Sequence, residues 1–182
     1  LDDGKVYSYA SDRSHSTIAK GLAKLSAASV IVGFNSIRFD LPVLFKLYPE
    51  FGKDIDSNRP EIGHLDLLVC SRLIWTDMYA RDVKQGKVPP LLRGRHSLKS
   101  WGYRLGMLKG EFAVEDFGKW SQEMQTYCER DVAITYRLWE LIVKKDYSTQ
   151  AMALEQMFAD LINQQEENGF GFDEVKAGEF YG

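Results

Sequence analysis

Hydrophobic positions along the chain follow two spacings, and each spacing predicts a different kind of element. The β-branched run at 30–34 predicts a buried strand, and the alternation at 5–10 predicts a second, shorter strand. Apolar residues spaced three or four apart predict helices, which we expect at about 18–25, from residue 40 onward, and at 65–75, 97–105, 121–145 and 150–168. Strands alternate with helices early and helices dominate later, which is typical of an α/β fold with a helix-rich C-terminal half.

Residue types at the ends of these segments fit the predicted boundaries. Ser14 or Ser16 is placed to cap the first helix. Pro42 lies in the first turn of the second helix, where its missing N–H costs nothing. Ser97 precedes the short fourth helix and Gly106 follows it, as expected for a cap and a stop. Only two strands are convincing, and that is fewer than an α/β core needs.

Composition limits the class of protein. The chain has 182 residues and 45% hydrophobic residues, which is enough for one globular domain. No run approaches the roughly 18 apolar residues of a membrane span, and the start lacks the features of a signal peptide. Cys70 and Cys128 fall in apolar helical patterns without a Cys-x-x-Cys unit. We therefore expect two buried free thiols in a cytoplasmic protein, with no zinc site.

A basic segment interrupts the helical pattern. Residues 76–95 contain two glycines, two prolines and little periodicity, so we expect a flexible loop there. Residues 83–110, the acid-free segment, contain no Asp or Glu although the whole chain has a net charge of −3. The cationic residues of this segment are Lys84, Lys87, Arg93, Arg95, Lys99, Arg104 and Lys109. Such a stretch attracts a phosphate chain, and the alternative is a solvated loop and helix face.

Three acidic residues stand where chemistry is expected. Asp40 follows the 30–34 strand, and ligands bind at strand ends in open α/β folds, so it is a candidate metal ligand or a helix cap. Tyr127 and Asp131 are four residues apart and share one face of the predicted 121–145 helix. The alternative for Asp131 is an ion pair with a nearby arginine. Asp66 is a possible secondary carboxylate, and we favour a capping role for it.

In order and spacing, these residues resemble the second and third motifs of the DEDD superfamily of RNase H-like 3′→5′ exonucleases. The second motif, Asn-x-x-x-Phe/Tyr-Asp, is matched by Asn35, Phe39 and Asp40. The third motif of the tyrosine subclass, Tyr-x-x-x-Asp, is matched by Tyr127 and Asp131. Thr126 stands where the histidine subclass has its histidine, so the resemblance is to the tyrosine subclass.

Longer flanking stretches are similar to the exonuclease domain of family A polymerases from podovirus-like phages. They are Leu-Asp-Leu-Leu-Val-Cys-Ser-Arg-Leu (65–73), His-Ser-Leu-Lys-Ser-Trp-Gly-Tyr-Arg-Leu-Gly (96–106) and Lys-Gly-Glu-Phe (109–112). Residues 165–173 resemble the segment that leaves the exonuclease domain for the polymerase thumb. The resemblance implies an RNase H-like exonuclease domain at 1–147 and a helical connection towards a thumb domain at 148–182. It implies a phage or prophage protein in the bacterial cytoplasm.

The resemblance also implies a mechanism. Two divalent cations, Mg²⁺ or Mn²⁺, would lie about 4 Å apart and clamp the scissile phosphate. Asp131 and Asp40 would be metal ligands, because hard cations need oxygen donors. Tyr127 would orient the attacking water, since a phenol with an ordinary pKa of about 10 is a poor base. The substrate would be a single-stranded DNA 3′ end, and the partner the polymerase domain of the same longer chain, with no membrane and no small-molecule cofactor.

Residues near these motifs are candidates for nucleic-acid contacts. Phe39 and Leu41 would wedge or stack terminal bases, and core packing is the alternative for both. Asn35 belongs to the second motif. The candidates for phosphate contacts are Arg93, Arg95, Lys99 and His96. For His96 the alternative is a structural histidine whose ring nitrogens are hydrogen-bonded within the protein.

One motif of the family has no match. The first motif, Asp-x-Glu on a central strand, is not found, because Asp54-Ile55-Asp56 follows a turn and Asp2-Asp3 lies where the family has a hairpin. We therefore expect an N-terminally truncated fold whose missing strands belong to a longer protein or to another chain. Loss of both ligands would lower the rate by several orders of magnitude. Three alternatives stay open: a non-catalytic single-stranded-DNA-binding module, a DEDD-type exoribonuclease and an inactive structural fragment.

Overall fold

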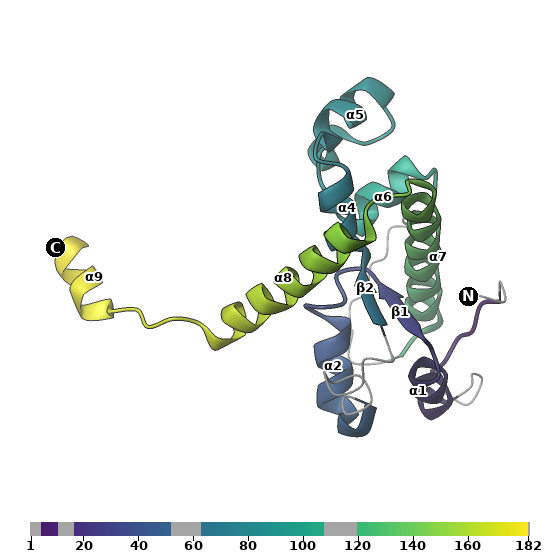
Figure 1. The fold of residues 1–182 in the computed structure, drawn as a ribbon, viewed down its shortest axis with the longest axis horizontal. Helices are drawn as coiled ribbons and strands as arrows, with labels where there is room; N and C mark the ends of the chain where they lie inside the picture. Colours follow the sequence, from purple (N-terminus) through teal and green to yellow (C-terminus); the bar gives the residue numbers. More distant parts are fainter. Residues whose placement is uncertain (1–4, 11–16, 52–62, 108–119, 182) are drawn as a thin grey trace.

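The computed structural model describes residues 5–10, 17–51, 63–107 and 120–181 and shows a helix-rich α/β arrangement (Figure 1). Two short strands lie in the middle of the body. Helices α4, α5 and α6 lie on one side of them in this view, α1 and α2 lie on the other, and α7 runs alongside. No helix among the described residues is long and apolar enough to cross a membrane. Ser14, Ser16, Asp2, Asp3, Asp54–Asp56 and the 109–112 stretch lie outside the described residues.

The described sheet consists of β1 (Val30–Gly33) and β2 (Gly63–Asp66), which pair in parallel. Val30 pairs with Gly63 and Gly33 with Asp66, so both strands end at the same edge. The 30–34 strand prediction is confirmed. The 65–75 helix prediction is wrong at its start, because residues 65 and 66 extend β2 and the helix α4 covers Leu67–Ile74. Four residues are too few for a hydrophobic period to reveal the strand.

The predicted strand at 5–10 does not form. Within it only Tyr9 makes an isolated bridge, and the rest has no regular structure. The segment instead lies against α1 (Ile18–Ser26), where a Cβ on Gly21 would meet the Tyr9 ring at 2.9 Å. Its alternation therefore reflects packing on a helix, with Lys24 placed 3.8 Å from the centre of the Tyr7 ring.

The remaining predicted helices are present with caps close to those expected. They are α2 (Asp40–Leu47), α6 (Leu98–Arg104), α7 (Gln122–Lys144) and α8 (Thr149–Asn168). The hydroxyls of Ser97 and Ser121 accept hydrogen bonds from backbone N–H groups of the helices they precede. Thr17 takes the N-cap position of α1. Gly106 adopts a φ of 70°, a left-handed conformation that often ends a helix and that glycine adopts most readily.

The predicted flexible loop at 76–95 is wrong. Residues Met78–Gln85 form helix α5, and Pro90–Leu92 form a 3₁₀ turn. Met78 and Val88 are buried, so this region is packed against the body. Turn residues define its ends, and tertiary contacts hold it.

The hydrophobic core lies between α4, α6 and α7. Its buried members are Leu67, Cys70, Trp75, Met78, Trp101, Ile134, Leu138 and Ile142. The Trp75 and Trp101 rings meet edge to face at a centroid distance of 4.9 Å, a favoured geometry for aromatic pairs.

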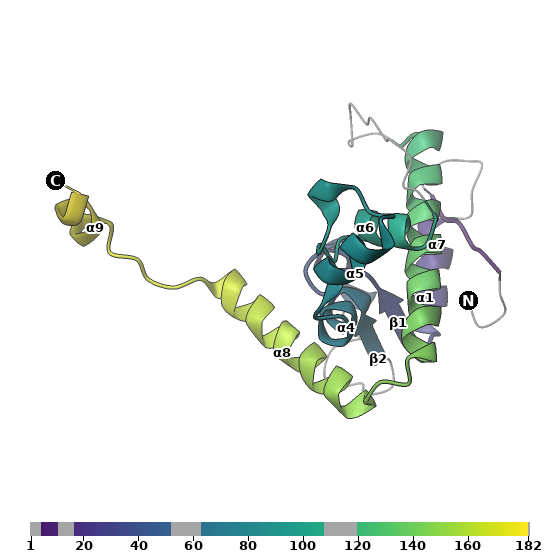
Figure 2. The same cartoon turned by 90° about the horizontal axis from the view of Figure 1, so that it is seen from above.

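The C-terminal part of the chain leaves this body. Helix α8 packs against α4 at its beginning and then extends outward, and α9 (Glu174–Tyr181) lies at the far end (Figures 1 and 2). The division predicted at residues 147 and 148 falls in the connection between α7 and α8.

Candidate functional site

The turn that joins β1 to α2 carries the second motif. Asn35 has a φ of 58°, a left-handed conformation that asparagine tolerates better than most residues. Ser36 is buried, and its hydroxyl lies 2.9 Å from Nε2 of His64 on β2. Burial lowers the pKa of His64, while the charges of Asp66 and Asp160 oppose this effect. The neutral form of His64 is therefore favoured, and its Nε2 either accepts a hydrogen bond from the Ser36 hydroxyl or donates one to it, depending on the tautomer.

Asp66, at the end of β2, organises this turn. Its Oδ1 accepts hydrogen bonds from the backbone N–H groups of Asn35 (2.8 Å) and Leu68 (2.9 Å). Its Oδ2 accepts one from Ile37 at 3.2 Å. The expected helix cap is confirmed, and both carboxylate oxygens accept hydrogen bonds from backbone donors. A secondary ligand role for Asp66 stays a prediction.

Asp40 is the first residue of α2. The N-cap position belongs to Phe39, whose side chain makes no capping bond, so the cap alternative for Asp40 is wrong. Burial raises the pKa of the Asp40 carboxyl, its own backbone N–H opposes the rise, and the charge of Asp66 adds to it. A nearby cation would favour the ionised form of such a carboxyl group.

Tyr127 and Asp131 lie one turn apart on α7, and both are half-buried. Cys128 lies between them on the same helix and is exposed, so the expectation that both cysteines are buried is wrong for this residue. Partial desolvation of its thiol by neighbouring groups nevertheless raises the pKa of Cys128, and the charges of Asp131, Glu129 and Asp40 raise it further. Asp40 and Asp131 are therefore both within electrostatic reach of one thiol, although 91 positions separate them in sequence.

The oxygen donors of Asp40 and Asp131 suit a hard divalent cation in kind. Their number is smaller than a complete site needs. Across the described ranges, no three His, Cys, Asp or Glu side chains come together as a metal-binding group. The two carboxylates would supply part of a coordination sphere.

The aromatic and aliphatic neighbours of Asp40 differ in accessibility. Phe39 is 65% exposed, whereas Leu41 is 8% exposed and belongs to the interior. Phe39 is thus available to a ligand, and Leu41 follows the core-packing alternative.

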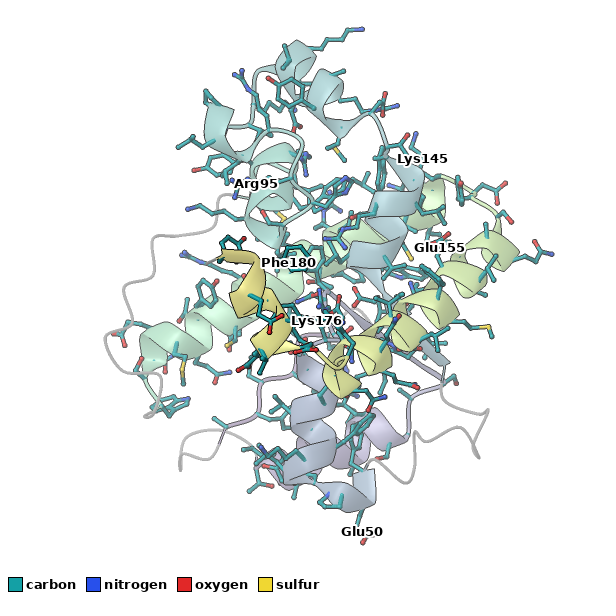
Figure 3. The ribbon with its side chains drawn as sticks, turned by 90° about the vertical axis from the view of Figure 1, so that its left-hand side faces the viewer. Glu50, Arg95, Lys145, Glu155, Lys176 and Phe180 are labelled. Atoms are coloured by element: carbon teal, nitrogen blue, oxygen red, sulfur yellow. The ribbon has the colours of Figure 1, made fainter. Side chains whose placement is uncertain are left out.

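The basic candidates form a separate region. Arg95 lies in the upper part of the body and Glu50, just beyond α2, lies at the bottom (Figure 3). Arg95 and Lys99 are exposed, while Arg93 donates from Nε to the Val88 carbonyl at 3.2 Å. His96 Nδ1 lies 3.1 Å from the Ser71 hydroxyl, and burial, with the Arg104 and Arg72 charges, lowers its pKa. These residues do not converge with α2.

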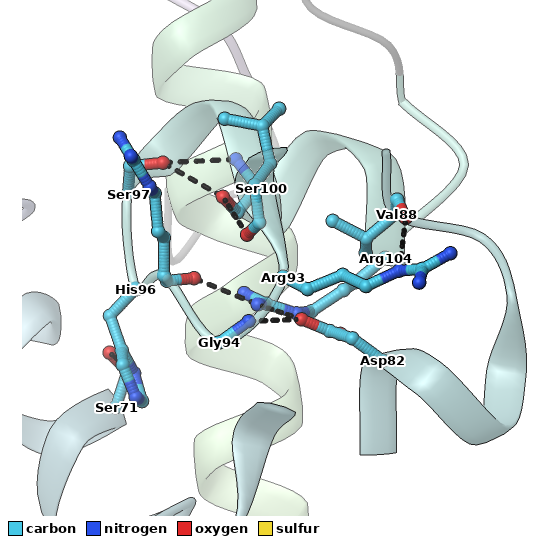
Figure 4. A network of polar contacts seen from close by, with 11 residues as sticks. Ser71, Asp82, Val88, Arg93, Gly94, His96, Ser97, Ser100 and Arg104 are labelled. Atoms are coloured by element: carbon cyan, nitrogen blue, oxygen red, sulfur yellow. Dashed lines mark hydrogen bonds and ion pairs between the residues drawn. The ribbon is translucent and has the colours of Figure 1, made fainter. Parts of the chain in front are cut away.

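A buried ion pair that the sequence did not reveal holds this basic region in place (Figure 4). Arg104 donates to Asp82 from Nε (2.9 Å) and from Nη2 (2.7 Å), and the Gly94 N–H donates to the same carboxylate at 2.9 Å. Arg104 also donates to the Arg95 carbonyl and lies 4.9 Å from the Trp101 ring centre. Burial alone would raise the pKa of Asp82, but the Arg104 and Gly94 hydrogen bonds and the Arg104 charge outweigh it and lower that pKa. The sequence carried one signal for this ion pair, because Asp82 is the last acidic residue before the acid-free segment.

Similarity to known proteins places this site in context. No protein-family model matches the chain. A DNA-directed DNA polymerase of Enterobacteria phage T3 is 30% identical over 217 aligned residues, which cover 98% of this chain and 31% of that polymerase. The DNA-directed DNA polymerase of Escherichia phage T7 is 30% identical over 197 residues, covering 87% and 28% respectively.

The chain is related to phage DNA-directed DNA polymerases. It spans about a third of the length of the curated relatives that it matches. The phage-polymerase part of the sequence resemblance is confirmed by these similarities. The helix-rich α/β arrangement with its small parallel sheet is compatible with the expected fold class.

Proposed function

We propose that this polymerase-related chain is a 3′→5′ proofreading exonuclease domain with an RNase H-like fold. The proposal is carried by the two motif matches, which place Asp40 directly after the turn that follows β1 and place Tyr127 and Asp131 one turn apart on α7. The charges of both acids at the Cys128 thiol are consistent with this arrangement. Both acids belong to motif matches with the family's spacing, and Phe39 beside Asp40 is exposed. The similarity to two phage polymerases supports DNA as the substrate.

In this proposal Asp40 and Asp131 would hold Mg²⁺ or Mn²⁺. Bound divalent cations activate a water molecule and stabilise the leaving 3′ oxygen. Tyr127, one helical turn before Asp131, orients the attacking water by a hydrogen bond. The exposed ring of Phe39 stacks on the terminal base, because every base offers a face to an aromatic ring. The reaction releases deoxynucleoside monophosphates from a frayed 3′ end.

The test is digestion of a 3′-labelled single-stranded DNA by the protein in its full natural length. Asp131→Ala and Asp40→Ala are expected to lower the rate at least a hundredfold, because each removes a ligand from a charge-stabilised transition state. Glu123→Ala removes an exposed acid from the same helix and is expected to leave the rate unchanged. Equal rates for wild type and Asp131→Ala would show that the activity does not belong to this site. A matched RNA oligonucleotide separates the exoribonuclease alternative, which predicts faster cleavage of RNA.

A second candidate is a non-catalytic module that binds single-stranded DNA. The exposed Phe39 and the exposed cations Arg95 and Lys99 favour it. Filter binding in EDTA separates the two functions. Retention of DNA with no hydrolysis after Mg²⁺ or Mn²⁺ is restored would favour this second function.

A further inference from the structure

The turn between β1 and α2 needs external support to keep its shape. Asn35 occupies the left-handed region, which is less favourable than the right-handed regions for every residue other than glycine. The Asn35 and Ile37 N–H groups both donate to the side-chain carboxylate of Asp66. Asp40 follows three residues after Ile37, so the position of the carboxylate depends on how firmly this turn is held.

The carboxylate of Asp66 supplies that support. It is 2% exposed and accepts three backbone hydrogen bonds, from Asn35, Ile37 and Leu68. These bonds join the end of β2, the start of α4 and the motif turn at one group. Hydrogen bonds to an ionised acceptor are about twice as strong as neutral ones. An amide in the same place has one acceptor oxygen, so its NH₂ group would face at least one of the three backbone N–H donors.

Asp66 is in turn fixed from outside the site by Gln156. This residue is 7% exposed and comes from α8, 90 positions further along the chain. Its Oε1 accepts from the Asp66 N–H at 2.9 Å, and its Nε2 donates to the Asp66 carbonyl at 3.0 Å. The side-chain amide thus pairs with the last residue of β2 as a neighbouring strand would. Because both backbone groups are buried, losing either partner would leave a costly unsatisfied group.

We propose that Asp66 and Gln156 are positioning residues for the Asn35–Asp40 turn, with Gln156 fixing β2 and Asp66 fixing the turn. The expected effect on hydrolysis rests on the proposed exonuclease function. The expected effect on the shape of the turn rests on the hydrogen bonds alone. Through Gln156, the placement of α8 is linked to the placement of Asp40. Neither residue touches the substrate in this proposal.

The structural arm of the test is amide hydrogen exchange, followed by mass spectrometry on peptides that cover residues 34–41. We expect Asp66→Asn and Gln156→Ala each to speed exchange in these peptides at least tenfold. The matched controls are Asp77→Asn, which changes an exposed N-cap of α5, and Gln164→Ala, which removes an exposed amide from α8. They are expected to leave exchange at 34–41 unchanged. Unchanged exchange in both test variants, with the fold intact by circular dichroism, would overturn the proposal.

The kinetic arm measures hydrolysis of a 3′-labelled single strand over a range of Mn²⁺ concentrations. In Asp66→Asn we expect kcat to fall about tenfold or more, with a higher Mn²⁺ requirement and a KM for DNA within about twofold of wild type. A merely structural loss would lower the active fraction and leave the Mn²⁺ requirement unchanged. An unchanged kcat and Mn²⁺ requirement would overturn the proposed role. If wild type hydrolyses no DNA, the proposed function is wrong, and hydrogen exchange still decides whether Asp66 and Gln156 hold the turn.

Discussion

Removal of the Asp82 carboxylate should destabilise the fold through the basic region, which comprises Arg93, Arg95, His96 and Lys99. The Asp82 and Arg104 side chains are 2% and 7% exposed, and their two hydrogen bonds form a bidentate pair. Removing one partner of a buried pair typically costs about 3–5 kcal/mol, because the other charge is left buried and uncompensated. The Gly94 N–H loses its acceptor as well. We therefore expect Asp82→Ala to lower the free energy of unfolding by about 3–5 kcal/mol.

Urea unfolding followed by circular dichroism measures this loss. Asp77→Ala is the matched control, since it removes an exposed partner of Arg81 from the same helix and should change stability little. A double variant, Asp82→Ala with Arg104→Met, should lose less than the sum of the two single variants, because neither buried charge is left alone. A loss below about 1 kcal/mol for Asp82→Ala, or strict additivity in the double variant, would refute this reasoning.

The same pair fixes the sign of a pH effect. The folded-state pKa of Asp82 is lowered, so its contribution to stability is fully present above the ordinary carboxyl pKa of about 3.9 and is lost as pH falls through the folded value. The stability difference between wild type and Asp82→Ala should therefore be constant near neutral pH. It should narrow as the pH falls below about 4.

Three further results are expected. Asp40→Asn should raise the melting temperature of the metal-free protein at pH 7 but not below about pH 3, because a folded-state pKa raised chiefly by burial makes ionised Asp40 destabilising above that pKa; no rise at pH 7 would contradict this. In the native protein Cys128 should be alkylated faster than Cys70, since Cys70 is buried and burial raises its pKa to about 11; equal rates, measured by mass spectrometry, would contradict the assignment. Gly94→Ala should lower the free energy of unfolding in urea by about 1–2 kcal/mol, and by more than Gly86→Ala. Both glycines have a left-handed φ, but a Cβ at position 94 would lie 3.1 Å from the Tyr79 side chain. Equal losses for the two variants would exclude that contact.

Helix boundaries were predictable because local chemistry sets them. Ser97, Ser121 and Gly106 occupy the cap and stop positions that their residue types favour in any context. The strand at 30–33 was predictable because a β-branched run has few other uses. The motif spacing named Asp40, Tyr127 and Asp131 as candidates, and their roles stay predictions.

Features that depend on distant residues were not predictable. Asp82 of α5 is buried because its carboxylate is paired with Arg104, 22 residues later, and accepts from the Gly94 N–H. Gln156 hydrogen-bonds the last residue of β2 from α8, a helix that begins more than 80 residues after β2 ends. No local pattern distinguishes Gln156 from the exposed glutamines of α8. The strand at 63–66 is defined by its pairing with 30–33 and not by its own sequence.

The central claim is that Asp40 and Asp131 share one acidic site that attracts divalent cations. The most direct measurement is the pH dependence of Cys128 alkylation, resolved by mass spectrometry in the metal-free protein. Asp40→Asn and Asp131→Asn should each lower the pKa of Cys128, as should added Mg²⁺ in wild type, whereas Asp77→Asn should not. A Cys128 pKa that responds to Asp131→Asn but is unaffected by both Asp40→Asn and Mg²⁺ would place the two acids in separate environments and contradict the account.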